Sequence, residues 1–218
     1  MLPVFILEFS RNHAALEKKY PTEQVFVVPY EKTKCIPDNF TLAGKLKLDL
    51  ADWEQKGRFI LRQDAEYNPA VQQLIPYILV ANAKGTKLYV LERIGGEERL
   101  KGSLALGCGG HINPEDAGDI ILNSALREMN EELKIRTKRN EQLRFIGYVR
   151  DLTSKTNDHT GFVFLIHATS ASVREKDSLI GRWAALPDLI ADYERFESWA
   201  RHIIDHLYVS HAGGRLFG

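Results

Sequence analysis

The feature that most constrains this chain is a helix that carries three glutamates at the edge of its buried face. Residues 117–134 read as a helix, and Glu128, Glu131 and Glu132 fall together on one flank of it. Its apolar stripe, at helical spacing, consists of Leu122, Ala125, Leu126, Met129 and Leu133. Carboxylates beside a core are costly to desolvate. Either this face is simply solvated, which helix geometry alone favours, or a cation lies on it.

The loop in front of this helix shifts the balance toward a cation. The stretch GCGGHINPEDAGD (107–119) places three glycines within four residues, and glycine allows backbone to approach a ligand closely. The N-terminus of the following helix favours phosphate. Mg²⁺ or Mn²⁺ would suit carboxylate oxygens together with substrate phosphates.

The remaining pattern predicts a mixed sheet between helical layers. The expected strands are 25–30, a hairpin over 74–94 that turns at NAKG, 143–152, 161–169 and 181–186. Further helices are expected at 48–64 and 188–208, and the apolar run in residues 1–13 reads as a strand. Pro187 is expected to break the last strand.

Composition excludes several classes of protein. The 29 basic and 29 acidic side chains cancel, so no global field attracts a nucleic acid polymer or an anionic membrane. No apolar stretch approaches the length of a membrane span. The two cysteines, Cys35 and Cys108, are too few for a disulfide framework and fit a reducing compartment. We therefore expect a cytoplasmic protein with no membrane partner.

Gly110 and the later run REMNEEL, with Arg127 at its start, resemble the signature of the Nudix hydrolases of the MutT type. That signature is a glycine, a spaced acidic residue, Arg-Glu, an apolar residue, any residue, and Glu-Glu. The resemblance covers roughly residues 74–190. It implies an α/β fold, a Nudix-type α/β/α sandwich with a mixed sheet, in which 74–218 form the Nudix-like domain and 1–73 an N-terminal α+β extension.

The resemblance also implies an activity, the hydrolysis of a diphosphate linkage in a nucleoside diphosphate derivative or a similar small molecule. Mg²⁺ or Mn²⁺ would be bound by Glu128, Glu131, Glu132 and the main-chain oxygen of Gly109. Arg127 would orient these carboxylates through a salt bridge. Glu128 or Glu131 would be the general base, although a loop carboxylate such as Asp158 or Glu175 remains an alternative.

Three departures from the signature stand out. The interval from Gly110 to Arg127 is about three residues longer than the family pattern, with NPED as the expected insertion. Counted back from Arg127, the spaced acidic position is Asp119, a supporting acid. Lys134 occupies the place of the usual glycine. None of these departures removes a metal ligand.

Substrate contacts are assigned to Gly110, His111 and Arg93, the last of which ends a strand before the loop. A surface arginine is an equally good explanation for Arg93. His159 reads more readily as a polar turn residue than as a site residue.

Three other residue types have simpler structural explanations. Trp183 is expected to pack in the core. Cys108 is expected to be a small buried residue, since no base can be assigned to it. His202 and His206 have the spacing of a metal pair, but the glutamate of the zinc-protease motif is missing.

Two alternatives to an enzyme of this kind stay open. A Nudix-like domain can sense a nucleotide or sugar diphosphate without cleaving it, with the N-terminal third as an effector or homodimer region. A diphosphate isomerase shares the fold, but its catalytic cysteine motif is not found here.

Overall fold

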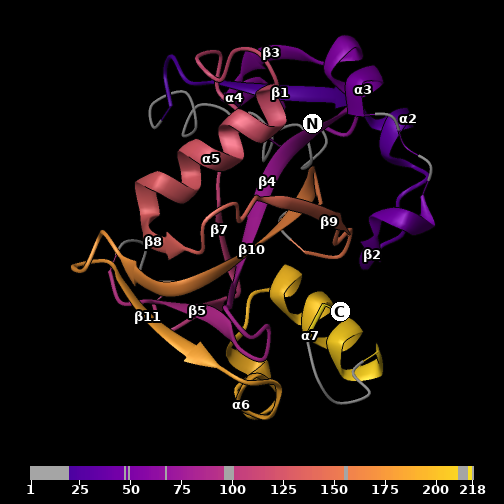
Figure 1. Cartoon of the computed structure of the whole chain (residues 1–218). Coiled ribbons are helices and arrows are strands. Elements are labelled where there is room, and N and C mark those ends of the chain that lie inside the picture. Colours follow the sequence, from indigo (N-terminus) through magenta and orange to yellow (C-terminus); the bar gives the residue numbers. More distant parts are fainter. Residues whose placement is uncertain are drawn as a thin grey trace.

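The computed structural model describes residues 20–46, 48, 50–66, 68–95, 101–154, 157–210 and 216–217. The strand expected within residues 1–13 lies outside these ranges. One mixed sheet dominates the described chain, and helices cover both of its faces (Figure 1). The sandwich expected from the sequence is therefore confirmed.

Two long strands form the centre of the sheet. β4 (Val71–Asn82) and β10 (His159–Val173) run parallel and pair from His159↔Gln73 to Ala168↔Asn82. The main path continues outward on both sides in the order β11-β5-β4-β10-β9-β2. Its other strands are β5 (Leu88–Arg93), β9 (Arg144–Val149), β11 (Leu179–Ala184) and β2 (Phe40–Leu42). The hairpin around NAKG is confirmed by the β4–β5 pairing.

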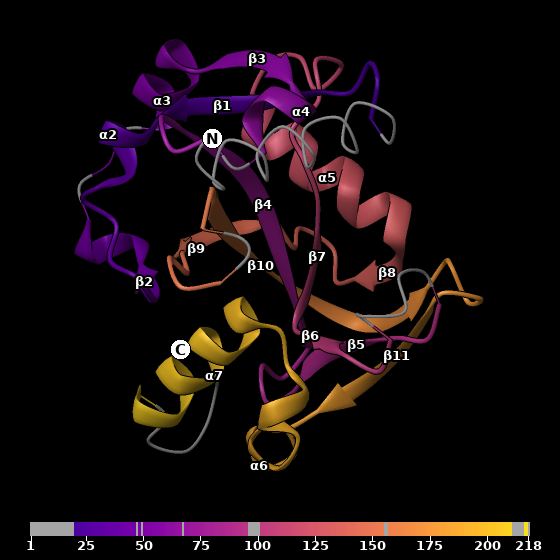
Figure 2. The same cartoon turned by 180° about the vertical axis from the view of Figure 1, so that it is seen from behind.

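Alternate residues of β4 point into two different cores, as the two-residue period of a strand requires. On one face, Leu79 packs in a cluster with α6 (Leu186–Ala191) and α7 (Ser198–Ser210). On the other face, Ile78 packs in a cluster with α5 (Ile120–Glu132) and α3 (Leu50–Lys56). The two views of Figures 1 and 2 show α5 and α7 on opposite sides of the sheet.

The N-terminal segment joins this sheet directly. β1 (Gln24–Pro29) pairs antiparallel with both β3 (Arg58–Leu61) and β4, and β2 pairs with β9. Trp53 of α3 contacts the ring of Phe162 in β10 with a centroid separation of 5.5 Å. The boundary expected after residue 73 falls inside β4, and the division into two domains stays a prediction.

The helix expected over residues 48–64 is wrong beyond Lys56. The chain instead forms α3, then β3, then the single turn α4 (Arg62–Ala65). At Gly57 an added Cβ would lie 2.0 Å from the ring of Phe26, so the chain passes too close to β1 for a side chain. The following apolar residues then pair with β1 as a strand.

The helix expected over residues 188–208 is also wrong, because it is divided. α6 ends at Ala191, a 3₁₀ turn spans Tyr193–Arg195, and α7 begins at Ser198. Phe196 is buried between them and forms a β-bridge with Leu104. Pro187 lies in the first turn of α6, where its missing N–H costs nothing.

The glycine-rich stretch is more regular than its sequence indicates. It begins with β7 (Gly107–Gly109), which pairs with β4, and β6 (Leu104–Ala105) directly before it pairs with β5. After α5 the chain passes without a loop into β8 (Leu133–Thr137), which pairs with β10. Lys134 therefore lies in a strand, which explains why no helix-ending glycine is present.

Candidate active site

Helix α5 presents the glutamates to the loop that follows β7. Asp119 caps the helix, because its carboxylate accepts a hydrogen bond from the backbone N–H of Leu122 at 3.0 Å. The buried positions of the helix are Ile121, Ser124, Ala125 and Met129. Leu126, expected in the apolar stripe, is instead 37% exposed. The other members of the expected stripe are buried or half-buried, namely Leu122, Ala125, Met129 and Leu133.

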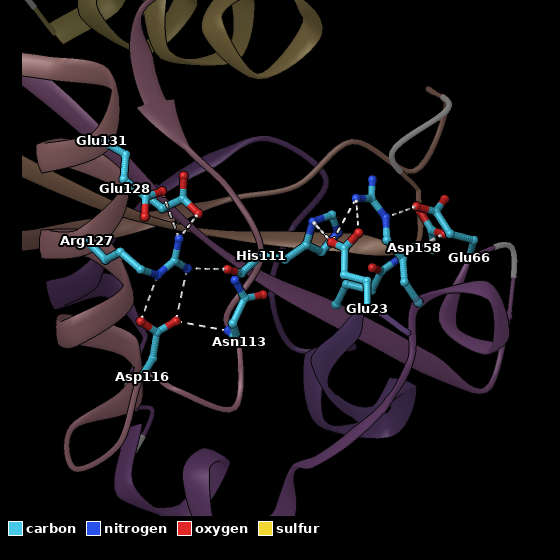
Figure 3. A network of polar contacts seen from close by, with 11 residues as sticks. Glu23, Glu66, His111, Asn113, Asp116, Arg127, Glu128, Glu131 and Asp158 are labelled. Atoms are coloured by element: carbon cyan, nitrogen blue, oxygen red, sulfur yellow. Dashed lines mark hydrogen bonds and ion pairs between the residues drawn. The ribbon is translucent and has the colours of Figure 1, made fainter. Parts of the chain in front are cut away.

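Arg127 is the centre of the polar network beside this loop (Figure 3). Its Nε and Nη2 donate to the two carboxylate oxygens of Asp116, at 2.9 and 3.0 Å. Its Nη1 donates to Glu128 at 2.8 Å and to Glu131 at 3.1 Å, and Nη2 also donates to the backbone oxygen of His111 at 2.8 Å. These contacts use all five donors of the guanidinium group. They raise the pKa of Arg127 and fix the two glutamates relative to the loop.

The glycines allow this close packing of loop and helix. An added Cβ at Gly110 would lie 2.4 Å from a carboxylate oxygen of Glu128. At Gly109 it would lie 2.1 Å from the backbone oxygen of Pro76, because β7 pairs with β4 there. Any larger residue would displace the carboxylate or the strand.

Glu132 is the most strongly perturbed carboxyl group of the site. Burial, followed by the charge of Glu128, raises its pKa to about 7, and Glu175 and Glu197 add to the rise while Arg93 opposes it. Burial also raises the pKa of Glu128. Two adjacent carboxyl groups that are both costly to ionise create a strong local demand for a cation.

The comparisons with known proteins bear on this geometry. No family model matches the chain. The chain is 29% identical to the protein YmaB of Bacillus subtilis (strain 168) over 168 residues, which are 72% of this chain and 82% of YmaB. Among solved structures, Tm1382, named a candidate Nudix hydrolase, superimposes with a TM-score of 0.70 and 25% identity, covering 85% of this chain and 98% of Tm1382.

The chain has the fold of the Nudix hydrolases. DR0079 from Deinococcus radiodurans is a more distant structural neighbour, with a TM-score of 0.48 and 18% identity over 69% of this chain and 91% of DR0079. Within the Nudix fold, α5 is the helix that carries the signature residues.

The acidic partner of Arg127 in the loop before α5 is Asp116, and Asp119 has a different place. Asp119, which we expected to support the site, caps α5 at the end of the helix far from Glu131 and Glu132. Asp116, with a side chain only 4% exposed, also accepts a hydrogen bond from the backbone N–H of Asn113 at 2.9 Å. Counting forward from Gly110 finds Asp116, whereas counting back from Arg127 finds Asp119.

Glu197 was missed by sequence reasoning. It precedes α7, and its carboxylate accepts a hydrogen bond from Nε of Arg93 at 3.0 Å. Its backbone N–H donates to Leu104 at 2.9 Å, which ties the start of α7 to β6. No local pattern marks this residue, because only the tertiary fold brings it beside Arg93.

His111 does not face the glutamates with its side chain. Its backbone oxygen accepts a hydrogen bond from Arg127, while its imidazole points toward Glu23 (Figure 3). The centroids of the His111 and His159 imidazoles are 5.6 Å apart. Burial, followed by the charge of Arg62, holds the pKa of His111 well below its usual range. The expected contact between this imidazole and a diphosphate therefore has no support from its position.

The other residues considered from sequence take no part in the hydrogen-bond network of Arg127 and the glutamates. Cys108 is buried, and burial raises its pKa. Trp183 packs edge-on against a tyrosine ring at 5.0 Å. His202 lies 3.9 Å from a carboxylate oxygen, whereas His206 packs against a phenylalanine ring. Within the described ranges, the structure offers no three-ligand metal cluster that contains either histidine. No helix in those ranges is long and apolar enough to cross a bilayer.

Proposed function

We infer that this protein is a metal-dependent pyrophosphohydrolase that cleaves a diphosphate linkage in a nucleoside diphosphate derivative or a similar compound. The observation that carries the proposal is the pair of half-buried carboxyl groups, Glu128 and Glu132. Glu128 packs against Gly110, and the fully hydrogen-bonded Arg127 lies next to it. The Nudix fold and the similarity to Tm1382 support the same activity.

The residues present fit a divalent cation. Glu128, Glu131 and Glu132 would hold Mg²⁺ or Mn²⁺, with the main-chain oxygen of Gly109 as a further ligand. Carboxylate oxygens are the ligands that these hard ions prefer, and burial raises the pKa values of Glu128 and Glu132, so a cation beside them would favour their ionised forms. The bound ion would supply charge neutralisation at the diphosphate and a water molecule of lowered pKa.

The side chains of the site take separate roles in this proposal. Arg127 orients Glu128 and Glu131 through its two Nη1 hydrogen bonds. Glu131 is 59% exposed at its side chain, so it can accept a proton from an attacking water molecule. Arg93 lies close enough to Glu132 to lower the pKa of that carboxyl group. We assign to Arg93, together with the backbone of Gly110, the binding of the negatively charged diphosphate.

The experiment is a panel of diphosphate compounds, assayed for release of phosphate or of a nucleoside monophosphate with and without Mg²⁺ or Mn²⁺. Glu131→Gln and Glu132→Gln should each lower turnover about a hundredfold or more while leaving the fold intact. Glu141→Gln is the matched control, since this glutamate contacts His167 elsewhere on the surface.

Two outcomes would contradict the proposal. If Glu131→Gln and Glu132→Gln turned over substrate as fast as the wild type, these glutamates would have no role in the hydrolysis. A wild-type protein that is inert on the whole panel, yet binds one of its members tightly, would establish a sensor in place of an enzyme.

A further inference from the structure

A second polar cluster lies on the other side of His111 from Arg127. Within the described ranges, Glu66, His111 and His159 form the one group whose ligand atoms all lie within 4.8 Å of one another. They come from three separate segments, namely the end of α4, the loop after β7, and the start of β10. Figure 3 shows Glu66 and Asp158 on the side of His111 away from the Arg127 network.

His159 is already oriented as metal-bound histidines are. Its Nδ1 lies 2.6 Å from a carboxylate oxygen of Asp158, and the other oxygen of Asp158 accepts a hydrogen bond from Gln73 at 3.3 Å. A carboxylate that holds one ring nitrogen fixes the tautomer and leaves the lone pair of the other nitrogen for a metal. Asp158 is thus occupied in this cluster and does not face the glutamates of α5.

His111 has a buried nitrogen with no partner. Its side chain is 14% exposed, and among the described residues no hydrogen-bonding group pairs with Nε2. A buried polar atom left unpaired costs roughly 1–3 kcal/mol, so its presence calls for an explanation. A bound ion would satisfy it.

The charges around the two imidazoles match a divalent ion. Arg62 donates two hydrogen bonds here, from Nε to Glu66 at 3.2 Å and from Nη1 to Glu23 at 2.9 Å. With Asp158, the cluster holds three carboxylates against one guanidinium group. The hydrogen bond from Arg62 uses Oε1 of Glu66, which leaves Oε2 for a metal.

We propose that Glu66, His111 and His159 bind a divalent transition-metal ion of the zinc class, at a centre separate from the glutamates of α5. Two imidazoles and one carboxylate are a ligand set that Zn²⁺ accepts, with one position open. Ligand atoms around tetrahedral zinc lie roughly 3.4 Å apart, so small side-chain rotations close the site. The ion ties α4, the loop after β7 and β10 together.

The test uses the full-length protein, stripped with a chelator, dialysed, and titrated with Zn²⁺ in excess Mg²⁺ against a chromophoric competitor. The wild type should bind one equivalent of Zn²⁺, and Co²⁺ in its place should give visible bands of a low-coordinate site. His159→Asn and Glu66→Gln should each weaken zinc binding about tenfold or more. The control His167→Asn changes a surface histidine that pairs with Glu141, and it should bind like the wild type.

Glu128→Gln separates this centre from the α5 site. It should leave zinc affinity unchanged while lowering hydrolysis, so failure of the hydrolase proposal would not affect the zinc result. Glu66→Gln carries the test if His159→Asn does not fold. Less than one equivalent of zinc in the wild type overturns the proposal, as does unaltered zinc binding by Glu66→Gln. Loss of zinc by Glu128→Gln, with retention by the histidine variant, would place the ion on α5 instead.

Discussion

The two polar clusters that meet at His111 are built from different chemistry. The Arg127 side gathers glutamates and one aspartate on a single helix and its preceding loop, and the metal ligands that these side chains offer are all carboxylate oxygens. The other side gathers two imidazoles and a carboxylate from three distant segments. Oxygen donors suit Mg²⁺ and Mn²⁺, whereas imidazole suits zinc-class ions. Neighbouring sites can therefore be expected to select different ions.

Asp116→Asn should produce the largest effect on this comparison, because it weakens both hydrogen bonds between Arg127 and Asp116. Hydrogen bonds between charged groups contribute roughly 1.5–3 kcal/mol each, so we expect unfolding free energy to fall by about 2–3 kcal/mol and turnover by about tenfold. Urea unfolding and steady-state kinetics measure the two effects.

The same variant should leave the zinc affinity of the histidine cluster within about threefold of the wild type, since that cluster does not contact Asp116. A parallel collapse of zinc binding would show that the two clusters form one cooperative site. Unchanged stability and turnover would instead mean that Asp116 does not hold Arg127 in place.

Glu132→Gln should show how much the charge of Glu132 destabilises the metal-free protein. Burial, followed by the charge of Glu128, raises the folded-state pKa of Glu132 to about 7, above the usual glutamate value of 4.5. Folding therefore takes up a proton between these values, and ionised Glu132 destabilises the fold increasingly as pH rises across this window. At pH 8 the variant should be more stable than the wild type by roughly 1–3 kcal/mol.

The gain from Glu132→Gln should shrink below about 1 kcal/mol at pH 5, where folded Glu132 is already protonated. Urea unfolding in chelator at the two pH values tests this. An equal gain at both pH values would mean that the charge of Glu132 is not the cause. Added Mg²⁺ should reduce the advantage at pH 8, because the wild type alone keeps this carboxylate.

Asp119→Ala should have the smallest effect, and it separates a cap from a site residue. Losing the N-cap should lower unfolding free energy by about 1 kcal/mol with turnover almost unchanged. Asp119→Asn is the matched control, since asparagine also caps helices. A fall in turnover comparable to that of Asp116→Asn would restore the supporting role that the sequence spacing gave to Asp119.

Sequence reasoning succeeded where the signal is local. The helix with its glutamates, the hairpin and the central strand β10 follow from periodicity and turn residues, so they can be read without the fold. Residues 58–61 could not be read in this way, because four residues after a glycine form a strand only by pairing with β1.

The candidate site shows the same division. Arg127 and its neighbouring glutamates lie within one helical turn and carry their own pattern. Asp116 depends on where the loop before the helix has its extra residues, which spacing alone does not decide. Glu197 and the partnership of His111 with His159 depend on contacts between segments far apart in sequence. No local pattern in the chain reports such contacts.

The pairing of β2 with β9 has a practical consequence for anyone who shortens this protein. A fragment starting at residue 74 would lack β2, which pairs antiparallel with β9 from Phe40↔Val149 to Leu42↔Gly147. The uncovered backbone amides and carbonyls would then be free to recruit strands from other molecules. Such a fragment is expected to precipitate, even though it retains every residue of the glutamate helix.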